Sequence, residues 1–121
     1  MRVVVDTNIL VDFLRGVPAA RAELARYHGV SISHITWMEV MAGAQPGDDE
    51  RKTRAFLRHF AVRQVDDDVA ERAVTLRRAH RIRLPDAIIW ATAQTLGQML
   101  VTRNTRDFPS NDAGVRFPYT V

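Results

Sequence analysis

Short β-branched runs alternate along this chain with longer segments of helical periodicity, and this alternation is the strongest constraint on its fold. The run Arg2–Val5 predicts a buried strand, and Asp6-Thr7-Asn8 after it is typical of a helix start. Such alternation predicts an α/β domain with a mainly parallel central sheet and helices on both faces. The other expected strands are 30–33, 62–65, 99–102 and 115–121. The first expected helix follows Asp6-Thr7-Asn8 and ends at Gly16, and the others span 18–28, 35–42, 48–61, 66–81 and 86–96.

The chain of 121 residues is long enough for one domain, and we expect residues 1–121 to form it because no repeat or linker interrupts them. No apolar run approaches the roughly 18 residues of a membrane span. The first apolar run reaches Asp6 too early for a signal peptide, which favours a cytoplasmic protein. The absence of cysteine excludes disulfides, iron–sulfur clusters and thiol catalysis.

Acidic and amide side chains stand where a parallel sheet would bring them to one edge. Asp6 follows the first strand, and Asn104 and Asp107 follow the strand at 99–102. Ligands of open parallel sheets bind outside the carboxyl ends of the strands. Asp86 opens a helix and can point toward the same edge. Asp6 and Asp86 also have a purely structural interpretation, as a helix cap and a first-turn acid.

Glu39 falls on the apolar stripe that Ile35, Met38 and Ala42 define on their helix. A glutamate that faces inward is costly unless it is paired or binds a metal. The sequence leaves two interpretations open, a metal ligand or a buried salt bridge to one of the many arginines.

Several carboxylates, without cysteine and without a metal-binding histidine spacing, favour a hard cation such as Mg²⁺ or Mn²⁺. Such an ion holds phosphate oxygens and activates water, so phosphodiester hydrolysis is the expected chemistry. The four histidines are expected at the surface or at helix ends: His28, His34, His59 and His80.

The chain is basic, with a net charge of +3, which suits a nucleic-acid partner but also an arginine-rich coding sequence. A basic cluster just before Asp86 could follow a phosphate backbone, or it could be a solvated helix face or a dock for an acidic partner. Arginines that flank Asn104 could play either part. The candidates for RNA contact are Arg77, Arg81, Arg83, Arg103 and Arg106.

Four segments, in order along nearly the whole chain, carry a family resemblance. They are Val3–Asn8 with Asp6, Ile35–Val40 with Glu39, Leu84–Ala91 with Asp86, and Leu100–Phe108. Together they resemble the PIN-domain ribonucleases, specifically the VapC-type toxins of bacterial and archaeal toxin–antitoxin systems.

The resemblance implies a single PIN-like domain and a Mg²⁺- or Mn²⁺-dependent endoribonuclease. It implies that Asp6, Glu39 and Asp86 are metal ligands, directly or through water. It also implies that Asn8 orients Asp6 and that Thr102 hydrogen-bonds within the carboxylate cluster. The implied partners are RNA, a VapB-like antitoxin that inserts an arginine or lysine among the acids, and a second copy of the chain.

The sequence departs from the family at Asn104, where many PIN domains have a fourth acid. An amide carries no charge. Asp107, one helical turn later, would substitute if the loop is helical there, so we count it among the catalytic and metal-binding candidates. The departure favours one tightly held metal and a second that is recruited with RNA.

The expected reaction is in-line attack on phosphorus by a metal-activated water, which leaves a 5′-phosphate and a 3′-hydroxyl. A catalytically inert PIN-like RNA-binding or interaction module is an alternative, favoured only by Asn104. A DNA-directed nuclease could use the same metal site. A receiver domain needs an acidic pair after the first strand and a late lysine, whereas this chain has Asp6 alone and Lys52 in mid-chain.

Overall fold

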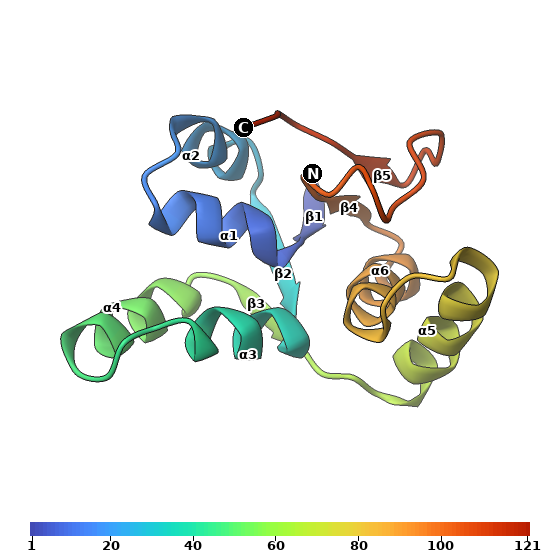
Figure 1. Cartoon of the computed structure of the whole chain (residues 1–121), viewed down its shortest axis with the longest axis horizontal. Helices are drawn as coiled ribbons and strands as arrows, with labels where there is room; N and C mark the ends of the chain where they lie inside the picture. The colour runs from blue at the N-terminus through green and yellow to red at the C-terminus, as the bar shows by residue number, and fades with distance from the viewer.

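The computed structural model describes residues 1–121 and contains five strands and six helices (Figure 1). The strands are β1 (Arg2–Val5), β2 (Gly29–Ser33), β3 (Ala61–Arg63), β4 (Met99–Val101) and β5 (Val115–Arg116). The helices are α1 (Thr7–Leu14), α2 (Pro18–Ala25), α3 (His34–Ala42), α4 (Asp48–Leu57), α5 (Asp67–His80) and α6 (Leu84–Leu96).

All five strands form one parallel sheet in the order β3-β2-β1-β4-β5, so β1 lies at its centre. Val5 of β1 is paired with Val101 of β4, which brings residues from the two ends of the chain together. The α/β class with a parallel sheet is therefore confirmed. No helix is long and apolar enough to cross a membrane.

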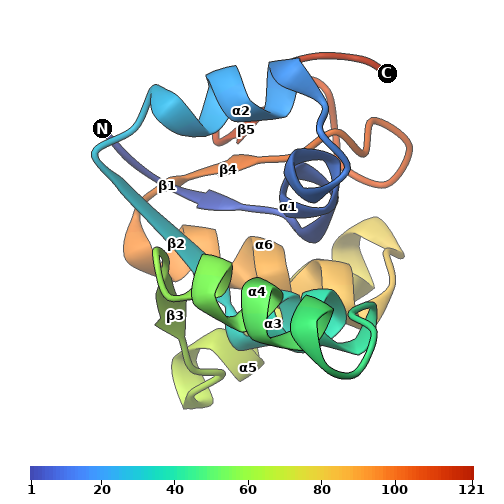
Figure 2. The ribbon, with the colours of Figure 1, turned by 90° about the vertical axis from the view of Figure 1, so that its left-hand side faces the viewer.

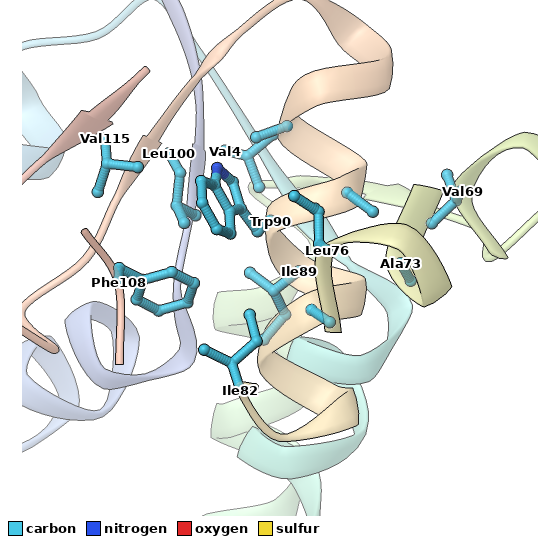
Figure 3. Packing of buried hydrophobic residues seen from close by; sticks show 13 residues of the cluster. Val4, Val69, Ala73, Leu76, Ile82, Ile89, Trp90, Leu100, Phe108 and Val115 are labelled. Carbon is cyan, nitrogen blue, oxygen red and sulfur yellow. The ribbon is translucent and has the colours of Figure 1, made fainter. Parts of the chain in front are cut away.

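Different helices cover the two faces of the sheet (Figure 1). On one face, Val4 and Leu100 pack against α5 and α6, and Trp90 is the largest fully buried side chain there (Figure 3). On the opposite face, Val3 and Val5 pack against α1, α3 and α4. Figure 2 shows the molecule with these helices toward the viewer. Successive residues of a strand point to opposite faces, so one valine run supplies both cores.

Side-chain caps begin three of the helices, and the two at Asp6 and Asp66 were predicted from the sequence. The Asp6 side chain caps α1, the Ser33 hydroxyl accepts a hydrogen bond from the Ile35 backbone N–H, and Asp66 does the same for Val69 at the start of α5. Gly97 ends α6 in the left-handed conformation, with a φ of 65°.

Several elements are shorter than the sequence predicts. Helix α2 ends at Ala25 and α4 at Leu57, because the next residues form tighter turns, such as the bond from the Phe60 N–H to the Leu57 carbonyl. Strand β3 ends at Arg63 rather than residue 65. The last strand is only two residues long, and Pro118 lacks the N–H that a longer pairing with β4 would need.

Candidate active site

The candidate site lies at the carboxyl ends of β1 and β4, where Asp6 directly follows β1. The Asp6 side chain is buried and both of its oxygens accept hydrogen bonds. The Thr7 backbone N–H donates to Oδ1 at 2.7 Å, and the Thr102 hydroxyl donates to Oδ2 at 2.7 Å. Asn8 Nδ2 lies 3.3 Å from the same Oδ2 and 3.4 Å from the Thr102 hydroxyl. Asn8 and Thr102 therefore contact Asp6 as the resemblance implies.

Burial raises the pKa of Asp6 from 3.8 to about 6, although the hydrogen bonds from Thr102 and Thr7 act in the opposite direction. The negative charges of Asp86 and Glu39 raise this pKa further. A carboxylate that pays such a desolvation penalty beside two other acids favours a cation as a neighbour.

Asp86 lies in the first turn of α6 and is buried, with Arg83 as its ion-pair partner at 3.4 Å. Burial raises the pKa of Asp86, the charge of Arg83 lowers it, and the nearby acids Asp107 and Glu39 raise it. The Arg83 side chain is 76% exposed, so solvent screens this pair and leaves the guanidinium free to move.

Glu39 is exposed, which corrects the prediction that it faces the apolar core. Helix α3 buries Thr36 and Val40, whereas Met38 of the expected stripe is 45% exposed. Thr36 can be buried because its hydroxyl lies 3.1 Å from that of Thr7. The same Thr7 hydroxyl donates to Glu39 Oε1 at 2.7 Å, and Glu39 forms no salt bridge with an arginine.

Asp6, Glu39 and Asp86, which lie far apart in the sequence, line one open pocket of about 280 Å³. As they stand, no three acidic or histidine side chains are close enough to hold one ion directly. An all-oxygen donor set of this kind nevertheless fits Mg²⁺, which keeps several waters and commonly binds through one or two carboxylates. The other residues around the pocket are Thr7, Asn8, Val11, Arg83, Arg103 and Asn104.

Asn104 lines this pocket, but Asp107 does not. The Asn104 Oδ1 accepts hydrogen bonds from the backbone N–H groups of Arg106 and Asp107, and its Nδ2 donates to Asp107 Oδ2 at 2.8 Å. The loop is a hydrogen-bonded turn that the Asn104 side chain holds, and it is not helical, which was the condition for Asp107 to replace the missing acid. Asp107 therefore lies outside the pocket lining, although its negative charge still raises the pKa of Asp86.

The basic residues lie in three places. Arg83 and Arg103 reach the pocket. Arg77, Arg78 and Arg81 form a separate exposed surface at the end of α5. Arg106 is exposed in the turn after β4.

Two contributors were missed by sequence reasoning, Thr7 and Asp12. Thr7 bonds Glu39 through its hydroxyl and Asp6 through its backbone. Asp12 is buried and binds the guanidinium of Arg103. The signal for Asp12 was its spacing, because it stands four residues after Asn8 and so shares the same face of α1.

Residues 3–113 match the family model described as the PIN domain. With its parallel sheet and its acids at the carboxyl edge, the chain belongs to the PIN-domain family. Ribonuclease VapC10 of Mycobacterium tuberculosis is 36% identical over 115 residues, which cover 88% of this chain and 86% of the relative. Ribonuclease VapC19 of the same species is 32% identical over 87% of this chain and 90% of its own. The resemblance to VapC-type proteins is thus confirmed.

Two solved structures extend the comparison. A toxin–antitoxin complex from Klebsiella pneumoniae contains a chain 44% identical to this one, with a TM-score of 0.92 and coverage of 98% of this chain and 99% of that one. DNA-bound VapBC from Salmonella typhimurium gives a TM-score of 0.77 at 24% identity, covers 96% of each chain, and shows the fold alone.

Proposed function

We propose that this chain is a VapC-type endoribonuclease toxin that hydrolyses RNA phosphodiester bonds with Mg²⁺ or Mn²⁺. The observation that carries the proposal is the shared pocket of Asp6, Glu39 and Asp86 in a chain 36% identical to a VapC ribonuclease. The site is a cluster of oxygen ligands with no nucleophilic cysteine, which suits metal-assisted hydrolysis.

Each acid has a distinct part in this proposal. Asp6 is held in one orientation by three donors, so it is the fixed ligand of the site. Glu39 and Asp86 complete the negative charge that attracts a cation. A bound Mg²⁺ or Mn²⁺ would activate water and stabilise charge on the phosphate. Arg83, exposed at the pocket, is suited to contact a phosphate oxygen.

The uncharged Asn104 bears on the number of metal ions. Its side chain is occupied by the turn and by Asp107, so three carboxylates remain at the pocket. This charge supports one tightly held ion and a second that arrives with RNA.

The proposed protein partner is a VapB-like antitoxin. A groove of about 340 Å³ adjoins the pocket and shares Val11 and Glu39 with it. Leu14 and Val40 give this groove apolar walls, so a partner segment could lie there and extend an arginine or lysine to the acids. The 44% identity to a chain of a toxin–antitoxin complex supports this partner. A second copy of the chain is the other expected partner, and light scattering of the purified protein would measure it.

The test is cleavage of end-labelled RNA by the purified chain with Mg²⁺, with Mn²⁺ and with chelator. We expect metal-dependent products with a 5′-phosphate and a 3′-hydroxyl. Asp6→Asn, Glu39→Gln and Asp86→Asn should each reduce kcat by about 100-fold or more, because each removes charge from the site.

Glu71→Gln is the matched control, since Glu71 is an exposed acid of α5 outside the pocket, and it should cleave like the wild type. A cyclic phosphate end would contradict the mechanism, because it would mean attack by the 2′-hydroxyl. Absence of both cleavage and calorimetric metal binding would favour the inert-module alternative.

A further inference from the structure

Two buried acids of this fold are each held by a two-point arginine contact and one tyrosine, and Glu23 also has Arg26 as an ion-pair partner at 3.7 Å. Asp12 of α1 accepts hydrogen bonds from Arg103 Nε at 2.7 Å, from Arg103 Nη2 at 3.0 Å and from the Tyr119 hydroxyl at 2.8 Å. Glu23 of α2 has an equivalent set, with Arg116 Nε at 2.8 Å, Arg116 Nη2 at 3.0 Å and the Tyr27 hydroxyl. The acids are 3% and 4% exposed.

The two clusters differ in how they reach the candidate site, and the Asp12 cluster does so through a side chain that lines the pocket. The Arg103 backbone N–H donates to Asn8 Oδ1 at 3.1 Å, and Asn8 Nδ2 lies 3.3 Å from Asp6 Oδ2. A connected path therefore runs from Tyr119 through Asp12, Arg103 and Asn8 to Asp6, in which the side chain of Arg103 joins the guanidinium that binds Asp12 to the backbone N–H that binds Asn8. The Glu23 cluster bonds no residue that lines the pocket. It meets Thr102 only through the strand pairing of β4 and β5, where the Arg116 carbonyl accepts the Thr102 backbone N–H at 3.0 Å, and this bond does not involve the Thr102 hydroxyl that holds Asp6.

The charge of Arg103 is already paired with the charge of Asp12. Its guanidinium makes a two-point contact with a buried carboxylate, and the hydrogen bond with Asp12 raises the pKa of Arg103. Withdrawing Arg103 toward a phosphate would leave the Asp12 charge buried and unpaired, which is costly. Arg83 also pairs with a buried carboxylate, that of Asp86, but its contacts are longer, at 3.4 Å, and its guanidinium is exposed to solvent, so moving it toward a phosphate costs less.

We propose that Asp12, Arg103 and Tyr119 form a positioning cluster that fixes the Asn8 amide and, through it, the orientation of Asp6, and that Arg103 does not bind RNA. This inference rests on the proposed function and deepens it. Tyr119 lies beyond the residues 3–113 that match the PIN family model, so the C-terminal segment supplies support that the family model does not cover.

The first test compares matched variants of the two clusters. Tyr119→Phe and Tyr27→Phe each remove one hydroxyl group that donates a hydrogen bond to a buried acid, and we expect similar decreases in Tm. Only Tyr119→Phe should lower kcat, by about 10-fold, with KM little changed, because residues that orient metal ligands have effects of this size. Asp12→Asn and Glu23→Gln form a second pair with the same expectation. Equal kcat values within each pair would overturn the proposal.

The second test asks whether Arg103 contacts phosphate. RNA binding by a cleavage-deficient Glu39→Gln background is measured at several salt concentrations. Arg83→Gln should reduce the salt slope by about one, as loss of a phosphate contact does. Arg103→Gln should leave the slope unchanged. A reduced slope for Arg103→Gln would overturn its assignment as a positioning residue.

The third test does not depend on nuclease activity. Hydrogen exchange of the Arg103 amide, followed by NMR in the metal-free protein, reports directly on its bond to Asn8. We expect exchange about 10-fold faster in Tyr119→Phe than in wild type or Tyr27→Phe, about the factor that 1.4 kcal/mol produces. Equal exchange in all three would refute the positioning cluster. A wild type that fails to cleave RNA would instead refute the proposed function.

Discussion

Asp6 combines two roles that the sequence left as alternatives. Its Oδ1 accepts the Thr7 backbone N–H and caps α1, while the carboxylate as a whole lines the pocket with Glu39 and Asp86. A capping acid has fixed backbone and side-chain geometry. The cap is therefore part of what orients Asp6 toward the pocket.

The raised pKa of Asp6 predicts a pH effect on stability. Its pKa is about 6 in the folded protein and 3.8 without the fold, so the folded state holds the extra proton between these values. Stability must then fall as pH rises through this window. Relative to Asp6→Asn, the free energy of unfolding of the metal-free wild type should fall by about 2 kcal/mol between pH 4 and 7. Urea unfolding of both proteins measures it, and a constant difference would contradict the prediction.

Thr102 is fully buried and joins three groups of the site. Its hydroxyl donates to Asp6, accepts from the Asn104 backbone N–H and lies 3.4 Å from Asn8 Nδ2. Thr102→Val keeps the shape but removes one of the three donors to Asp6 and the side-chain acceptor of the Asn104 backbone N–H, so we expect a loss of about 1–3 kcal/mol in stability. Thr102→Ser keeps the hydroxyl and should recover kcat even though it loses a methyl group. Failure of serine to recover activity above the valine variant would contradict this role.

At the scale of the elements, the starts of helices were predicted better than their ends or their buried faces. Starts such as those at Asp6 and Asp66 depend on one side chain and the neighbouring backbone, which the sequence displays. The prediction of which face of α3 is buried was wrong, because the polar residue Thr36 is buried there. Its burial depends on Thr7, which comes from a different helix and which no periodicity of α3 could indicate.

The corrected orientation of α3 predicts unequal effects for two truncations. Val40 packs in the core with Ile9 and Leu10, whereas Met38 is exposed. Val40→Ala should lower the free energy of unfolding by about 2 kcal/mol. Met38→Ala should change it by less than about 0.5 kcal/mol. Chemical denaturation of both variants is the measurement, and the reverse order would restore the orientation expected from the sequence.

For the molecule as a whole, the meeting of Asp6 and Asp86 at one pocket was predictable because the carboxyl ends of parallel strands share one edge, whereas Glu39 was expected there only from the family resemblance. The cluster of Asp12, Arg103 and Tyr119 was not predictable. Its members are separated by 91 and 107 residues, and Tyr119 lies outside any strand or helix. Strand alternation gives no information on where such a segment returns to the fold.

The two cores share the strands of one sheet, so we expect them to unfold together. Trp90 reports on the α6 side, and Trp37 packs on the opposite core. In Trp37→Phe and Trp90→Phe, the fluorescence of the remaining tryptophan should follow the same urea transition as circular dichroism. Separate midpoints within either variant would show that the two faces unfold independently.

The pairing of the first strand with β4 also has a consequence for biosynthesis. Asp6 and Thr102 are 96 residues apart, so a ribosome adding about 5–20 residues per second needs roughly 5–20 s to supply the second after the first. Until then β1 lacks its β4 neighbour and the pocket lacks one wall. The nascent chain therefore has no complete pocket until β4 and Thr102 have been synthesised and have left the ribosome.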